Sequence, residues 1–328
     1  MKRLLFSILL LNIFLIANAQ DTIKEKISYI PDIDGIIKTK FEYDFENDLS
    51  RFSVRNARFG AKGNANSIVS YKAEVDLSDE GKMKMLDAYV KLTPIKNLEI
   101  FLGQRKIPFG TDYLRNPADN MFANRSFVAK YINDGLRDIG FVAVYKLNIF
   151  VPVELSASAM NGSGSNNPQW KENPNYSGRI VIGNETGINA KANIYEGDTE
   201  KEQNLNMYGG ELSYKTNKFL IETEYISRNW NDTLNTKFEA TGLYIHSYYK
   251  FETNKSKIKY ILPTCRYDVM GADIFSSKSV AERITIGVNF GFDKKLFQSE
   301  IRFNYENYLN SSNSNHTSKF TIEFVARF

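Results

Sequence analysis

Residues 98–147 read LEIFLGQRKIPFG, then TDYLRNPADNMFANRSFVAKYINDG, then LRDIGFVAVYKL. Its first and last parts alternate apolar and polar residues, as β-strands do. Between them, residues 107–136 form a connection rich in Arg, Lys, Asn and Asp. A connection of this length without regular structure is uncommon in a compact domain and is usually functional. We therefore expect a β protein whose functional site includes this loop.

The N-terminal residues predict export from the cytoplasm. Lys2 and Arg3 precede an apolar run from Leu4 to Ile16, and Ala17-Asn18-Ala19 places small residues at the cleavage positions. The run is shorter than the roughly 20 apolar residues that a membrane-spanning helix needs, and no later stretch approaches that length. We expect residues 1–19 to be a signal peptide, 20–34 a short periplasmic segment and 35–328 the folded domain.

Charge, Cys and His content narrow the class of function. Cleavage after Ala19 leaves 40 basic against 38 acidic residues, a net charge near +2 that argues against nucleic-acid binding. The single Cys265 excludes an internal disulfide. His246 and His316 have no Ser partner in a catalytic motif, and no His or Cys group has metal-ligand spacing. No Walker loop or dinucleotide fingerprint is present. We expect no catalytic residues, metal or cofactor.

Period-two alternation returns along nearly the whole chain. Residues 36–46 place Ile37 and Phe41 on one face and Lys38 and Glu42 on the other, and residues 320–328 repeat the pattern. One such strand also fits a soluble β-sandwich. Many segments of roughly ten residues with this alternation are the signature of a transmembrane β-barrel with its apolar face outward.

The pattern predicts about sixteen antiparallel strands, a number that suits a barrel wide enough for an aqueous channel. They are residues 35–46, 50–62, 67–78, 83–93, 97–106, 137–147, 151–160, 177–184, 187–195, 205–216, 218–228, 236–251, 255–268, 281–292, 296–308 and 318–328. Mostly short connections alternate with longer ones, as periplasmic turns alternate with extracellular loops in such barrels. This parity places residues 107–136 and 161–176 at the extracellular end. In the strand at 50–62, Arg55 and Arg58 fall on opposite faces unless a β-bulge intervenes. Gly209 and Gly210 likewise leave the faces of their strand undetermined.

Several motifs, taken in order, resemble the phosphate-selective porin O and P family. They are RNARFGAKG at 55–63, YKAEVD at 71–76, LDAYV at 86–90, GQRKIPFG at 103–110, NRS at 124–126 and RDIG at 137–140. The resemblance implies a sixteen-stranded homotrimeric channel in a Gram-negative outer membrane, with the third extracellular loop, residues 107–136, folded inward as a constriction. Phe328, which ends an amphipathic last strand, resembles the signal read by the barrel-assembly machinery.

An anion filter needs cationic donors that converge on a narrow passage, and Arg presents a fork of donors that matches phosphate oxygens. The pore-lining candidates are Arg105, Lys106, Arg115, Arg125, Lys130 and Arg137, with Arg55 and Arg58 on the neighbouring strand. Of the adjacent Arg105 and Lys106, at most one points into the pore if the pleat continues. Arg125 and Arg137 fit the role of structural tethers equally well, because Asp112, Asp119, Asp134 and Asp138 lie in or beside the loop.

We therefore predict an outer-membrane porin, surrounded by lipid, through which small solutes diffuse passively. The inner face also carries acids: Glu42, Asp44, Glu74, Asp76, Glu154, Glu211, Glu222 and Glu224. This mixture fits a general or mildly anion-preferring pore better than a strict phosphate channel, so the ion stays open. The alternative is a surface-binding or adhesion barrel, whose loop at 161–176, with Trp170, recognises a ligand. A hydrolase is the less favoured alternative.

Overall fold

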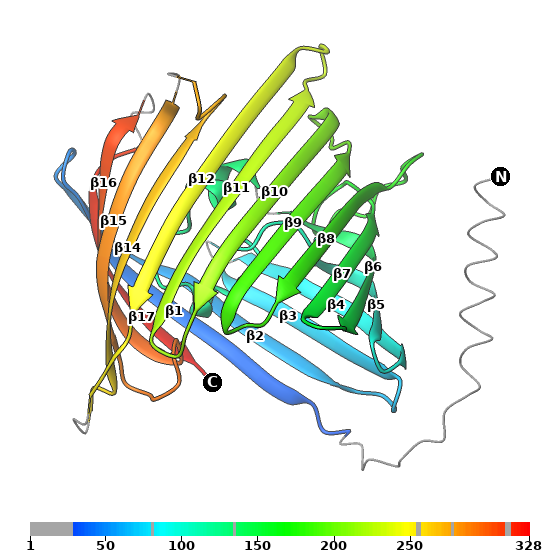
Figure 1. Cartoon of the computed structure of the whole chain (residues 1–328), viewed down its shortest axis with the longest axis horizontal. Coiled ribbons are helices and arrows are strands. Elements are labelled where there is room, and N and C mark those ends of the chain that lie inside the picture. The colour runs from blue at the N-terminus through cyan, green and yellow to red at the C-terminus, as the bar shows by residue number, and fades with distance from the viewer. Residues whose placement is uncertain (1–28, 80–81, 134–135, 254–256, 277–278, 312–315) are drawn as a thin grey trace.

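The computed structural model describes residues 29–328 except 80–81, 134–135, 254–256, 277–278 and 312–315. The strands form one antiparallel sheet that closes on itself, because β1 (Asp32–Asp44) pairs with both β2 (Leu49–Asn64) and β17 (Lys319–Arg327) (Figure 1). The expected signal peptide, residues 1–19, lies outside the described residues. The first strand begins at Asp32, slightly before the predicted start.

In the described part of the chain, seventeen strand elements form a barrel of sixteen strands, which confirms the predicted barrel. β12 (Lys237–Tyr249) and β13 (Phe251–Glu252) are two segments of one barrel strand, and both pair with β14 (Tyr260–Gly271). The largest boundary difference is the start of β14, which was expected at residue 255. The other strands are β3 (Val69–Asp79), β4 (Lys82–Ile95), β5 (Leu98–Lys106), β6 (Arg137–Asn148), β7 (Pro152–Met160), β8 (Asn175–Gly183), β9 (Gly187–Gly197), β10 (Gln203–Lys215), β11 (Phe219–Asn231), β15 (Ser279–Gly291) and β16 (Ser299–Ser311).

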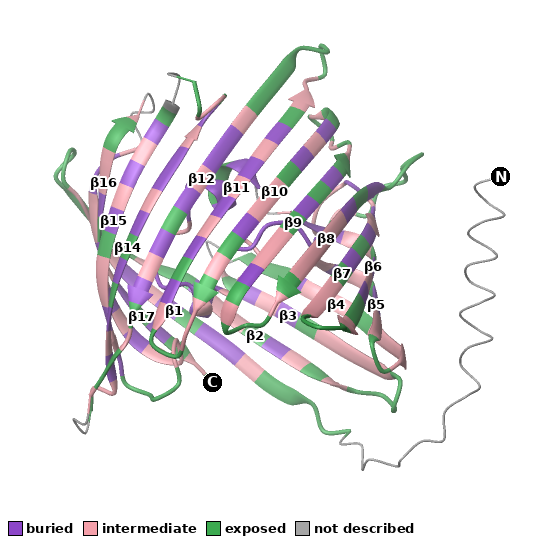
Figure 2. Cartoon of the chain, viewed as in Figure 1, coloured by how far each residue is buried: buried purple, intermediate pink, exposed green. Residues whose placement is uncertain are grey.

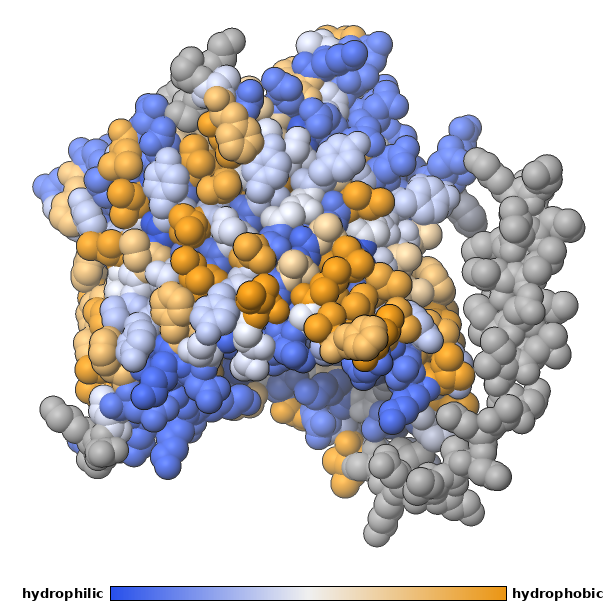
Figure 3. All heavy atoms as spheres, in the orientation of Figure 1, coloured by the Kyte–Doolittle hydropathy of each residue, from blue (hydrophilic) through white to orange (hydrophobic). Residues whose placement is uncertain are grey.

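The alternation resolves into a polar inner face and an apolar outer face. In β16, Glu300, Arg302 and Asn304 are at most 2% exposed, whereas Tyr305 on the opposite face is 38% exposed. Figure 2 shows the resulting alternation of buried and more exposed residues along the strands. Apolar side chains gather at mid-height on the visible face in Figure 3, with hydrophilic ones towards both ends. A closed barrel pairs its backbone groups between strands, as a hydrocarbon surrounding requires.

A β-bulge settles the faces of β2. Its register with β1 shifts so that Lys38 pairs with Asn56 but Thr39 pairs with Val54, which leaves Arg55 as the extra residue. Val54 is 52% exposed on the outer face, while Asn56 is buried. The adjacent glycines of β10 do not interrupt the strand, because Gly209 and Gly210 both pair with residues of β9 and β11.

The connections differ most in the first half of the barrel. Residues 107–136 and 161–174 are long and lie at one end, and short turns such as 96–97 and 149–151 lie at the other. After β13 the contrast fades, because 253–259 and 292–298 match 272–278 and 312–318 in length. Among the described residues, no helix is long and apolar enough to cross a membrane.

The main apolar core lies between the 107–136 loop and the wall. The loop contains a short 3-10 turn, η1 (Pro117–Asp119), and a π-helical turn, η2 (Val128–Ile132). Its buried apolar residues are Ile107, Phe109, Val128 and Ile132, and they pack with Val142, Met207, Ile226 and Tyr244 of β6, β10, β11 and β12. The loop is therefore packed against the inside of the barrel wall and is not surrounded by solvent.

Candidate functional site

The 107–136 loop leaves the wall between β5 and β6 but is bound by distant strands. Inward-facing cations and an amide donate hydrogen bonds to its backbone carbonyls. They are Lys38 to Pro117 (3.1 Å), Arg302 to Ala118 (2.7 Å), Asn289 to Met121 (2.9 Å), Arg266 to Asn124 (3.0 Å), Arg283 to Arg125 (2.9 Å) and Arg228 to Ile132 (2.7 Å). These donors come from β1, β11, β14, β15 and β16, so the loop runs across the inside of the barrel (Figure 1).

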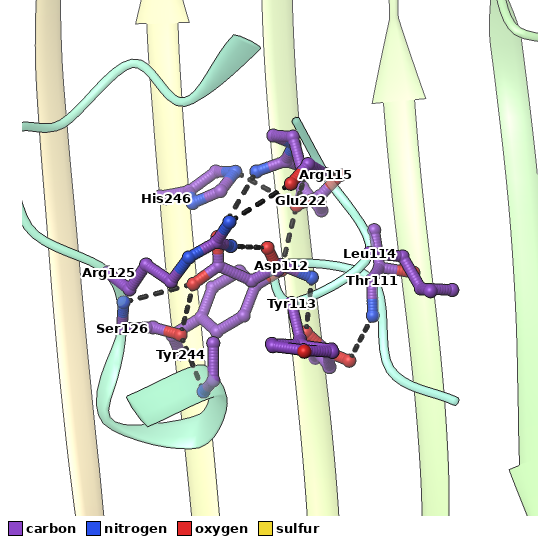
Figure 4. A network of polar contacts seen from close by, with 12 residues as sticks. Thr111, Asp112, Tyr113, Leu114, Arg115, Arg125, Ser126, Glu222, Tyr244 and His246 are labelled. Atoms are coloured by element: carbon purple, nitrogen blue, oxygen red, sulfur yellow. Dashed lines mark hydrogen bonds and ion pairs between the residues drawn. The ribbon is translucent and has the colours of Figure 1, made fainter. Parts of the chain in front are cut away.

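Two acids of β11 hold the first part of the loop, and one of them, Glu222, is labelled in Figure 4. Glu224 accepts hydrogen bonds from the backbone N–H groups of Thr111 (2.6 Å) and Asp112 (3.1 Å). Glu222 receives Arg115 Nη2 on both oxygens, at 2.5 and 2.7 Å. Charge-assisted bonds of this kind are stronger than neutral ones. The loop is thus fixed by charge at 111–115 and by carbonyl contacts further on.

Glu222 also lies against two aromatic side chains of β12. Tyr244 Oη donates to Glu222 Oε1 at 2.8 Å, and His246 Nε2 lies 3.0 Å from the same oxygen. His246 is buried and stacks on Tyr244. His246 is therefore enclosed in the network that holds Arg115.

Asp112 is the acid around which the loop closes on itself. Its Oδ2 accepts hydrogen bonds from Ser126 N (3.0 Å) and Ser126 Oγ (2.6 Å). Burial opposes its ionisation, but the nearby Arg125 and Arg115 and the Ser126 hydroxyl outweigh it and lower the pKa of Asp112 to about 2. The carboxylate is therefore charged at neutral pH and clamps the two limbs of the loop together.

Most of the predicted cations have partners in the protein. Lys106 donates to the carbonyls of Tyr113, Leu114 and Arg115, and Arg125 donates to those of Asp112 and Arg115. Arg137 pairs with Asp87, and Arg58 pairs with Asp76 at 2.9 Å. The Arg105 guanidinium lies 3.8 Å from the centre of the Phe101 ring. Lys130 Nζ lies 4.7 Å from the centre of the Tyr131 ring, and neither Arg55 nor Lys130 shows an ion pair among the described residues.

A cavity of about 740 Å³ lies between the loop and the wall towards the end with the long loops, and we call it the cationic chamber. Among the described residues, three acids line it: Glu42, Asp76 and Glu306. The described basic side chains that line it are twelve: Lys38, Lys40, Arg51, Arg55, Arg58, Lys84, Lys106, Arg125, Lys130, Arg137, Arg283 and Lys319. Six of the eight predicted residues are among them; Arg105 does not line it, and Arg115 lines another cavity. Sequence reasoning missed Lys38, Lys40 and Arg283 as site residues, although the polar faces of their strands contain them.

A second cavity of about 720 Å³ lies on the other side of the loop, towards the short turns, and we call it the mixed chamber. The charges of its described lining residues balance: Arg115, Lys146, Lys191 and Lys215 against Asp119, Glu154, Glu185 and Glu222. Apolar residues line it as well. The loop thus separates a cationic chamber from a chamber without net charge.

The connection predicted at 161–176 ends at Pro174, where β8 follows, and it borders the cationic chamber. Asn166 N donates to Gln104 Oε1 at 2.6 Å, and Ser165 lines the chamber. Trp170 is fully exposed. The base of this loop is therefore fixed to the pore mouth.

The closed barrel has a polar interior, an apolar exterior and a loop across its lumen; with the family match given next, it identifies an outer-membrane porin of a Gram-negative cell. Residues 37–182 match the model of the phosphate-selective porin O and P family, which confirms the resemblance found in the sequence. A comparison with curated proteins finds no match.

Solved porins share the fold. OmpF of Salmonella typhi, in complex with daunomycin, is 13% identical with a TM-score of 0.66, over 91% of this chain and 97% of that one. An anion-selective porin from Comamonas acidovorans is 11% identical with a TM-score of 0.64, over 91% and 99%. OmpT of Vibrio cholerae, solved in a trimer form, is 11% identical with a TM-score of 0.63, over 91% and 99%. At these identities the comparison establishes the architecture.

Proposed function

We propose that this outer-membrane channel passes small anions in preference to cations, and that the cationic chamber is its entrance. The observation that carries this proposal is that twelve basic and three acidic side chains of the described residues line this chamber. A concave site lined by one sign of charge focuses the field and raises the local concentration of counter-ions. Rings of Arg and Lys suit anion and phosphate pores. Passage by diffusion needs no catalytic group, so we infer a channel and not an enzyme.

The acids of the chamber are already neutralised. Glu42 pairs with Lys40 at 2.6 Å, and Glu306 pairs with Arg283 at 3.2 Å. Asp76 is held by Arg58. Arg55, Lys130 and Lys319 show no ion pair within the described part of the chain, so their charges act on a passing solute. The bulge in β2 supports this role for Arg55, because it turns an additional side chain towards the chamber.

Reversal potentials of single channels in a planar bilayer under a KCl gradient test the proposal. We expect the unmodified protein to prefer chloride, and Arg55→Ala combined with Lys130→Ala to reduce that preference. Lys201→Ala is the matched control, because Lys201 is exposed and lines neither chamber. Cation preference in the unmodified protein, or an equal change in the control, would overturn the proposal.

We also propose a homotrimer and a cleaved signal peptide. The trimer form of OmpT and the family resemblance support the first. The sequence of residues 1–19 supports the second. Light scattering of the detergent-solubilised protein and N-terminal sequencing of the mature chain test them; a monomer, or a chain beginning at Met1, would contradict them.

A further inference from the structure

The mixed chamber offers a passing anion little free positive charge. Three of its four basic residues are engaged by carboxylates: Arg115 with Glu222 at 2.5 Å, Lys146 with Glu99 at 3.1 Å, and Lys191 with Glu211. An inorganic oxyanion that leaves the cationic chamber would therefore lose most of its compensating charge. Moving a charged group away from water without such compensation is costly. The mixed chamber therefore stabilises inorganic phosphate poorly.

The same chamber has an apolar shelf. Its members, Met121, Leu220, Tyr248, Leu296 and Phe297, all line the cavity and belong to one hydrophobic cluster. They come from the loop, from β11, from β12 and from the 292–298 turn. The first three are buried behind the surface, while Leu296 and Phe297 are partly exposed. Parts of the chain that are far apart in sequence therefore meet to make one apolar surface inside an otherwise polar pore.

Phe297 is held in this position at an energetic cost. Its φ of 62° lies in the left-handed region, which residues other than glycine seldom adopt. Its backbone N–H donates to Tyr260 Oη at 3.0 Å, and its ring meets that of Tyr248 edge to face at 6.3 Å. Backbone strain of this kind persists where the surroundings impose it and gathers at functional sites. The turn is thus folded so that an aromatic ring borders the chamber.

From these two chambers we propose that the preferred solute is an organic anion, with an acidic group and an apolar body, and not inorganic phosphate. This inference rests on the proposed anion channel. The acidic group is collected by the cationic chamber. Past the loop, where compensating charge is scarce, the apolar body lies on Leu296 and Phe297, and burial of apolar surface replaces the lost ionic contacts. The solute must fit chambers of about 740 and 720 Å³ in turn, which limits it to a small molecule.

Phosphate and phenyl phosphate are a suitable probe pair, because they share the anionic group and differ in the apolar body. The measurement is the half-blocking concentration of each for the chloride current of single channels. We expect phenyl phosphate to block the unmodified channel at a concentration about tenfold lower than phosphate. Phe297→Ser should reduce this ratio by about three- to tenfold, the usual value of an aromatic contact. Phe297→Tyr keeps the ring and should keep the ratio.

Phe275→Ser is the matched control, because Phe275 is an exposed aromatic residue in a loop outside both chambers. Leu296→Ser replaces Phe297→Ser if that variant does not fold. Chloride selectivity should stay unchanged in every variant. Equal block by both probes, or an unchanged ratio in the shelf variants, would overturn this inference alone. Absence of chloride selectivity in the unmodified channel would instead overturn the proposed function, and this inference with it.

Discussion

Ion pairing divides the arginines of the pore into two kinds. Arg115 is 15% exposed in its side chain and holds both oxygens of Glu222, which is 6% exposed. Arg55 is exposed to the cationic chamber, and no ion pair is seen for it among the described residues. A buried pair contributes mainly by keeping its partner from being a buried, unpaired charge. The first arginine therefore supports the loop, and the second is free to act on solutes.

Replacing Arg115 by Ala should destabilise the protein, because Glu222 then stays buried without the cation that holds both of its oxygens. We expect a loss of about 3 kcal/mol in the free energy of unfolding, the usual cost of removing one partner of such a pair. Denaturant unfolding in detergent measures it. The double variant Arg115→Ala with Glu222→Gln should recover part of the loss. A double variant no more stable than the single one would show that the pair is not the cause.

At this scale the sequence predicts which residue types line the pore but not how they pair. Arg105, Arg115 and Arg125 look alike within the loop and its flanking strand. They end over an aromatic ring, on a carboxylate of β11 and on carbonyls of the loop itself. The partner of Arg115 is 107 residues away in the chain, and no local pattern reveals it. Lys106 likewise stabilises the loop, because it donates hydrogen bonds to three of its backbone carbonyls.

Among the elements, the 107–136 loop is held by contacts with residues far away in the chain. Glu224 accepts two backbone N–H groups of this loop, from Thr111 and Asp112, and is itself buried. The segment at Thr111 and Asp112 thus depends on one carboxylate for these two backbone bonds, and a segment held by few contacts opens more readily. Glu224 is therefore the point at which a small change should loosen the loop without breaking the barrel.

Glu224→Gln should weaken both bonds to the loop, because the acceptor loses its charge. We expect larger current fluctuations in single channels and faster amide exchange at Thr111 and Asp112, by about tenfold, or ~1.4 kcal/mol. Glu154→Gln removes the same charge from the lumen, and no contact with the loop is seen for it in the described structure, so it is the control. Equal current noise and exchange in both variants would show that lumen charge, and not the anchor, is responsible.

The strands were predictable because each carries its own alternation, and their observed bounds lie within a few residues of the predicted ones except at the start of β14. The bulge at Arg55 was predictable only as a condition for Arg55 and Arg58 to share a face. The path of the loop was not predictable from periodicity. It is set by donors such as Lys38 and Arg302, at the two ends of the chain, which meet the loop only after the barrel closes.

In the whole molecule, the charge of the pore lining differs between the two ends of the pore. The cationic chamber lies at the end with the long loops, and the mixed chamber lies at the end with the short turns. Each is bounded by the same loop. An anion therefore meets an attractive field on one side of the constriction only. A pore built in this way should conduct differently in its two directions.

Salt concentration should control this asymmetry. The Debye length falls from about 10 Å at 0.1 M to about 3 Å at 1 M, so the field of the cationic chamber no longer extends across its opening at high salt. We expect an asymmetric current–voltage curve and a clear chloride preference in 0.1 M KCl, and a nearly symmetric curve with weaker preference in 1 M KCl. The measurement is made on one channel while the solutions on both sides are exchanged. The orientation of the channel in the bilayer is then the same at both salt concentrations. Arg55→Ala should lower the asymmetry at 0.1 M and have little effect at 1 M. If selectivity and asymmetry were the same at both concentrations, the preference would come from close contacts at the constriction and not from the charge of the chamber.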